Sequence, residues 1–279
     1  MRLAISNIAW DIAEDEVIAQ MLQRHRIDAI DIAPGKYFPQ PAQATISEII
    51  QVKDWWAEHG IEITGMQALL FGTAGLNVFG PPESQAAMLQ HLDAICRIGA
   101  GLGALKVVFG SPKNRDRSGL SDNETMAMAI SFFSRLGDIA ESHGVIICLE
   151  PNPTCYGANF MTNSAETAQV VTHIAHQSIR MQFDTGALTI NCEDPASMLQ
   201  DCASLIGHVH ASEPDLLPLG DGGTDHGNMF AALQQHLPKH LVSIEMLATK
   251  NEPHEMSIER ALTVATHNYR HKEVGANIL

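Results

Sequence analysis

The stretch VIICLEPNP, residues 145 to 153, places an apolar run directly before a glutamate and two prolines. An uninterrupted apolar run of this length, closed by breakers, is typical of a strand that is buried on both faces, as in parallel sheets. Glu150 therefore stands at the carboxyl end of a predicted buried strand, 145–150. Carboxylates are rarely buried without a partner, so its position predicts a partner elsewhere in the fold.

Other segments have the same strand-like character, and they alternate with longer segments of helical periodicity. The predicted strands are 2–8, 29–33, 61–67, 104–110, 145–150, 179–184, 206–211 and 241–246. Between them, as in 46–59 and 123–143, apolar residues recur at three- and four-residue spacing, which is typical of an amphipathic helix. Ser121 precedes the second of these helices as an N-cap, and Gly144 follows it as a stop signal.

The order of these segments predicts the architecture. Alternation of strand and helix forces parallel pairing through right-handed crossovers. Eight such units in about 250 residues favour a closed (β/α)8 TIM barrel over an open doubly wound sheet. Because neither a linker nor a composition break divides the chain, we expect one α/β domain over residues 1–279.

Composition limits the classes of function. The formal net charge of -15 counts against nucleic-acid binding, which normally uses a basic patch. The five cysteines form no C-x-x-C pair, which is typical of free thiols in a reducing compartment. The N-terminus has no signal pattern, and no apolar run reaches the roughly 20 residues that span a bilayer. We therefore expect a cytoplasmic protein with no membrane partner.

Ionisable residues stand at the ends of four consecutive predicted strands. They are Glu150, Asp184, His210 and Glu245. In a TIM barrel these ends share one face, which carries the functional groups. Each carboxylate taken singly is more often solvated or salt-bridged, but three that converge would repel one another unless a cation lay between them. This oxygen-rich set predicts one divalent metal ion, Mn²⁺, Mg²⁺ or Co²⁺, with zinc as an alternative. His208 lies on the same side of its strand and is expected in a second layer or the core.

Three cations lie within five residues directly after the predicted strand 104–110. Lys113, Arg115 and Arg117 could form a clamp for a phosphate or a carboxylate, or could belong to a solvated loop. Other polar rim residues could bind substrate hydroxyls or only form turns: Asn7, Gln67 and Asn152, with His208 as a further substrate contact. Trp10 and Phe71 are expected to wall the pocket.

Four motifs carry a resemblance to a known family. LEPNP, QFDTG, HVHASEP and SIEM resemble the metal-site segments of the xylose isomerase-like barrel superfamily, particularly its ketose 3-epimerase and hydroxypyruvate isomerase branch. The resemblance implies that Glu150, Asp184, His210 and Glu245 hold one metal ion. It also implies that Glu150 and Glu245 flank the substrate and exchange a proton at carbon.

Two positions depart from the epimerase pattern. The epimerases usually have a substrate-binding histidine three residues after the aspartate, where this chain has Ala187. They also carry an arginine in the region that corresponds to PDLLPL, residues 214–219, which has none. These departures leave the metal set unchanged and count against 3-epimerisation of a free ketose.

The sequence therefore predicts an isomerase or epimerase of a sugar or sugar phosphate, working through a metal-stabilised enediolate. Three alternatives remain: a dehydratase of a cyclic polyol or keto acid, an endonuclease IV-like phosphodiesterase, and a non-catalytic sugar-binding barrel. The nuclease would need more histidines on the strands 29–33, 61–67 and 104–110, which offer Asp31 and Gln67 but no histidine. Trp55-Trp56 and the helix 125–133 could be core or the interface of a homo-oligomer.

Overall fold

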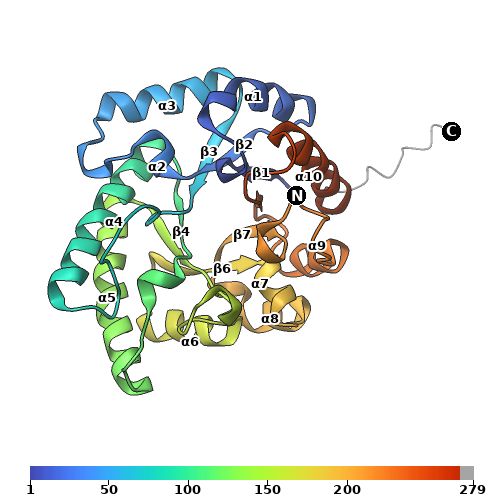
Figure 1. The fold of residues 1–279 in the computed structure, drawn as a ribbon. Helices are drawn as coiled ribbons and strands as arrows, with labels where there is room; N and C mark the ends of the chain where they lie inside the picture. The colour runs from blue at the N-terminus through green and yellow to red at the C-terminus, as the bar shows by residue number, and fades with distance from the viewer. Residues whose placement is uncertain (271–279) are drawn as a thin grey trace.

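The computed structural model describes residues 1–270; residues 271–279 of the predicted domain lie outside the described residues. Eight parallel strands pair in sequence order, and the last pairs with the first, so that the sheet closes into a barrel surrounded by helices (Figure 1). The strands are β1 (Leu3–Ser6), β2 (Ala29–Ile32), β3 (Glu62–Met66), β4 (Lys106–Phe109), β5 (Ile146–Leu149), β6 (Ile179–Asp184), β7 (Ile206–Ser212) and β8 (Val242–Glu245). The predicted (β/α)8 barrel is confirmed.

The helices follow the strands along the chain. They are α1 (Asp15–Arg24), α2 (Pro34–Tyr37), α3 (Ile46–Glu58), α4 (Pro82–Leu102), α5 (Asp122–His143), α6 (Ser164–Ile174), α7 (Thr185–Ile190), α8 (Pro195–Cys202), α9 (His226–His236) and α10 (His254–Tyr269). Local sequence sets the ends of α5. Ser121 and Glu124 form a capping box at its start, and Gly144 ends it with a φ of 71°.

The main core lies between the barrel and its helices. Phe109 of β4 packs edge-on against Phe133 of α5, and Phe132 packs in the same way against Phe133. Trp56 is buried on α3 and packs against Trp10, which is also buried. Trp56 and the two phenylalanines of α5 are therefore core residues.

Two further features concern the cysteines and the length of the apolar helices. All five cysteines are free; Cys96, Cys148 and Cys202 are buried, and Cys155 and Cys192 are exposed. Within residues 1–270, no helix is both long enough and apolar enough to cross a membrane.

Candidate metal and substrate site

The carboxyl ends of β5 to β8 bring four ionisable side chains together. Glu150 directly follows β5, Asp184 ends β6, His210 lies near the end of β7, and Glu245 ends β8. One ligand atom from each of the four lies within 4.8 Å of all the others. Bonds of roughly 2.0–2.6 Å to a shared ion allow ligand atoms to lie up to about 5 Å apart. The four side chains are therefore close enough for one metal ion.

Neutral hydrogen-bond donors hold one oxygen of each glutamate. Nδ2 of Asn152 donates to Oε2 of Glu150 at 3.2 Å, and Nε2 of Gln67 donates to Oε1 of Glu245 at 2.6 Å. The other oxygens face Nδ1 of His210, at 3.4 Å for Oε1 of Glu150 and 3.2 Å for Oε2 of Glu245. Each glutamate thus keeps one oxygen directed to the centre of the group.

Backbone geometry places the remaining carboxylate. Asp184 is the N-cap of α7, and its Oδ1 accepts from the backbone N–H of Ala187 at 2.6 Å. Its Oδ2 accepts from the hydroxyl of Ser212 at 2.7 Å. A side chain held at both oxygens has little rotational freedom, so the strand-to-helix turn fixes the position of this carboxylate.

The electrostatics of the group fit a divalent cation. Burial, together with the negative charges of Glu245 and Glu150, raises the pKa of Asp184 to about 7. Burial disfavours a charged His210, but the charge of Glu245 and the hydrogen bonds of both glutamates raise its pKa well above the usual value. Without a cation, Asp184 and His210 therefore hold their protons more strongly than they ordinarily would. A metal ion would supply the missing positive charge, so the residues present fit one.

A cavity of about 860 Å³ opens above these residues, lined by Glu150, Asp184 and Glu245 among others. Gln67 and Asn152 line it too, and both are buried. Each amide uses its N–H group on a glutamate, while Oε1 of Gln67 and Oδ1 of Asn152 have no hydrogen-bond partner among the described residues. These two oxygens are therefore buried acceptors beside the cavity that no described residue satisfies.

The predicted anion clamp is not present at the cavity. Arg115 is fully buried, and its Nη1 donates to the backbone carbonyl of Glu150 at 2.7 Å. Arg117 pairs with Asp122, and Lys113 is exposed. Among the described residues that line the cavity, Lys36 is the one cationic side chain. Arg115 is absent from the cavity wall because the 3-10 turn that contains it directs its guanidinium inward, to the end of β5.

Of three other residues that were expected at the pocket, two lie away from the cavity and one lines it. Asn7 is buried and its Oδ1 accepts from the backbone N–H of Ala33 at 2.7 Å, so it joins the ends of β1 and β2. Trp10 is also buried and donates to Asp15, which corrects its expected place in the pocket wall. Phe71 does line the cavity, and it is 89% exposed.

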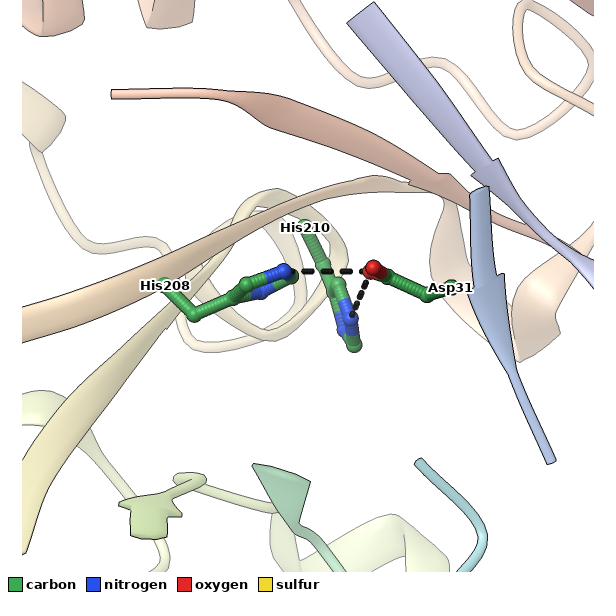
Figure 2. Close-up of side chains that lie close together, drawn as sticks. All are labelled: Asp31, His208 and His210. Atoms are coloured by element: carbon green, nitrogen blue, oxygen red, sulfur yellow. Dashed lines mark ion pairs between the residues drawn. The ribbon is translucent and has the colours of Figure 1, made fainter. Parts of the chain in front are cut away.

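Asp31 of β2 joins the site from a strand that had no predicted role in it. Its Oδ2 lies 3.0 Å from Nε2 of His208 and 4.0 Å from Nε2 of His210 (Figure 2). His208 is thus in a layer beneath the cavity, in contact with Asp31. The sequence contained a signal for this contact, because Asp31 interrupts the apolar run AIDIA of a buried strand.

Sequence comparisons give two matches. Residues 19–265 match the family model described as xylose isomerase-like TIM barrel. L-ribulose 3-epimerase of Methylomonas sp. (strain DH-1) is 27% identical over 117 residues, which cover 42% of this chain and 41% of that relative. The alignment therefore spans less than half of the curated relative.

Solved structures share the whole barrel. D-psicose 3-epimerase from Clostridium cellulolyticum H10, crystallised with D-tagatose, has a TM-score of 0.80 at 17% identity and covers 97% of this chain and 100% of its own. The 3-keto-D-glucoside 4-epimerase of E. coli has a TM-score of 0.76 at 17% identity, over 94% and 98%. D-allulose 3-epimerase from Methylomonas sp., in complex with D-allulose, has a TM-score of 0.72 at 21% identity, over 95% and 89%. At these identities the similarity shows the fold.

Proposed function

Because this chain belongs to the xylose isomerase-like TIM barrel family, we propose that it is a divalent-metal-dependent sugar epimerase or isomerase. The observation that carries the proposal is the convergence of three carboxylates and one imidazole within 4.8 Å at the carboxyl end of the barrel. The named relatives, which act on L-ribulose, D-psicose and D-allulose, support the same class of reaction.

Glu150, Asp184, His210 and Glu245 would hold the metal ion. Their three carboxylates and one imidazole favour Mn²⁺, Mg²⁺ or Co²⁺, with Zn²⁺ as the alternative. When bound, such an ion supplies Lewis acidity that stabilises negative charge on the oxygens of an enediolate.

The two glutamates are the proposed proton carriers. Oε1 of Glu150 and Oε2 of Glu245 lie 3.4 Å and 3.2 Å from Nδ1 of His210, so both oxygens face the same centre. For an epimerisation, one glutamate removes the proton from the carbon next to the carbonyl and the other returns a proton to the opposite face. For an aldose-ketose isomerisation, one glutamate carries the proton between adjacent carbons.

The polar groups of the cavity favour a neutral polyhydroxy substrate. Gln67 and Asn152 line the cavity as uncharged amides, which suit the hydroxyls of a sugar better than the charge of a phosphate. Lys36 is already engaged, since its Nζ donates to the backbone carbonyls of Asn7 and Trp10. The wall therefore offers no free cation for a phosphate among its described residues. We propose a free sugar or a neutral sugar derivative in preference to a sugar phosphate.

Solvent deuterium exchange tests this function. The metal-free protein is incubated in D₂O with a panel of ketoses, keto-glycosides and sugar phosphates, with and without Mn²⁺. We expect Mn²⁺-dependent incorporation of deuterium next to the carbonyl of a neutral sugar. Glu245→Gln should lower the exchange rate by about 10²- to 10⁴-fold, whereas Glu252→Gln, beside Arg260, should retain the wild-type rate. Absence of exchange throughout the panel, or exchange at the wild-type rate in Glu245→Gln, would refute the proposal.

A further inference from the structure

A buried carboxylate faces two buried histidines across the interior of the barrel (Figure 2). Asp31 belongs to β2 and the histidines to β7, and these strands are not neighbours in the sheet. Oδ2 of Asp31 lies 3.0 Å from Nε2 of His208 and 4.0 Å from Nε2 of His210. The contact therefore joins two strands that β1 and β8 separate in the sheet, and it reaches one of the proposed metal ligands, His210.

The neighbouring strand is shaped to receive this carboxylate. The hydroxyl of Thr64 in β3 donates to Oδ1 of Asp31 at 3.0 Å. A Cβ at Gly65 would lie 2.5 Å from the same oxygen, so the absence of a side chain there makes room for it. Burying an ion costs several kcal/mol before its partners are counted. The residues on either side of Asp31, Ile30 and Ile32, are buried and apolar, so Asp31 is the charged exception among its neighbours.

The orientation of the His210 ring indicates what the Asp31 carboxylate does. Its Nδ1 faces Glu150 and Glu245, so Nδ1 is the nitrogen directed to the proposed metal. A neutral imidazole that binds a metal through Nδ1 must carry its proton on Nε2. Nε2 of His210 is buried and has no hydrogen-bond partner among the described residues. A buried N–H group needs an acceptor, and Oδ2 of Asp31 lies on that side of the ring.

We propose that Asp31 is a positioning residue whose negative charge, 4.0 Å from Nε2 of His210, keeps the imidazole proton on Nε2 and so leaves Nδ1 free to bind the metal. The inference rests on the metal site of the proposed function and adds a residue outside that ligand set. Carboxylates that orient metal-binding histidines typically account for a 10- to 100-fold difference in metal affinity.

Metal binding by the whole protein tests the assignment without any substrate. The dissociation constant for Mn²⁺ is measured by titration calorimetry on the metal-free wild type, Asp31→Asn and Asp15→Asn. Asp15 is a matched control, because it is a buried carboxylate that accepts from Trp10 and Tyr37 and contacts none of the proposed ligands. We expect Asp31→Asn to weaken binding by about 10- to 100-fold and Asp15→Asn to leave it unchanged. Wild-type affinity in Asp31→Asn would overturn the role of Asp31 and leave the proposed function standing. A wild-type protein that binds no Mn²⁺, Mg²⁺, Co²⁺ or Zn²⁺ would overturn both proposals.

Two further measurements remain decisive if Asp31→Asn fails to fold. His208→Gln leaves the Asp31 carboxylate in place and removes the side chain that competes for it. We expect that variant to retain Mn²⁺ affinity, whereas a loss of 10-fold or more would assign the effect to His208. In the Mg²⁺-loaded wild type, ¹⁵N NMR of the imidazoles should show His210 protonated at Nε2. A proton on Nδ1 would overturn the proposal.

Discussion

Replacing Gly110 by alanine moves the Glu150 carboxylate without removing any chemical group from the site. A Cβ at residue 110 would lie 2.0 Å from Oε2 of Glu150 and 3.0 Å from its Cδ. Ordinary Cβ contacts begin at 3.4 Å, and 3.4 minus 2.0 leaves a shift of about 1.4 Å for the carboxylate oxygen. Gly110 is therefore the residue that allows β4 and Glu150 to lie this close together.

The expected effect is large on chemistry and small on stability. A displacement of about 1 Å in a reacting group costs on the order of 10²-fold in rate, or about 2.7 kcal/mol. We therefore expect Gly110→Ala to lower kcat/KM by at least that order and to weaken Mn²⁺ binding. The group that moves is the end of a flexible side chain, so overpacking should cost no more than about 1–3 kcal/mol of unfolding free energy.

The assay combines Mn²⁺-dependent deuterium exchange, Mn²⁺ titration and urea unfolding. Gly227→Ala is the matched control, because its Cβ would meet only Oδ1 of Asp225 at an ordinary 3.4 Å, near the start of α9. That variant should keep both metal affinity and exchange rate. If Gly110→Ala also kept both, the reasoning about the position of Glu150 would be refuted.

Three other perturbations have defined outcomes. Glu245→Gln should lower the rate of C–H exchange by about 10²- to 10⁴-fold while the circular dichroism spectrum stays unchanged; comparable activity would contradict its role as a proton carrier. Gln67→Leu removes the donor that lies 2.6 Å from Oε1 of Glu245. Because a hydrogen bond to a charged group contributes about 1.5–3 kcal/mol, kcat/KM should fall about 10- to 100-fold. An unchanged kcat/KM would contradict this role of Gln67. Burial raises the pKa of Asp184 to about 7, so the folded metal-free protein retains a proton that the unfolded chain releases near the ordinary value of 3.8. The contribution of Asp184 to the Tm of the metal-free protein should therefore fall as pH rises from 3.8 to 7. Mn²⁺ should remove that loss and Asp184→Asn should lack it, whereas a Tm slope that persists in Asp184→Asn would assign the titration to another group.

The barrel could be predicted because its determinants are local in the sequence. Residues 145–150 read as a buried strand from their apolar run alone, and the strand β5 (Ile146–Leu149) forms there. The start of α5 follows from Ser121 and Glu124, and its end follows from Gly144. Such signals act within one element, and strict alternation then leaves few topologies for the chain to adopt.

The proposed ligand set could be predicted for a geometric reason. All strands of a parallel barrel run in one direction, so residues at their carboxyl ends reach one face without any knowledge of the packing. Glu150, Asp184, His210 and Glu245 came from four strand ends in this way, and the structure brings them within 4.8 Å. Their catalytic and metal-binding roles stay predictions.

Tertiary structure alone decided which group each polar side chain meets. The sequence places Arg115 in a loop, but its contact with the carbonyl of Glu150 depends on the turn that directs its long side chain inward. The amides of Gln67 and Asn152 hold glutamates as well as facing the cavity, a pairing that needs three-dimensional distances. Asp31 meets His208 only because pairing of β1 with β8 closes the barrel and brings β2 near β7. Periodicity and strand direction act along the chain, whereas these contacts depend on side-chain packing between segments far apart in it.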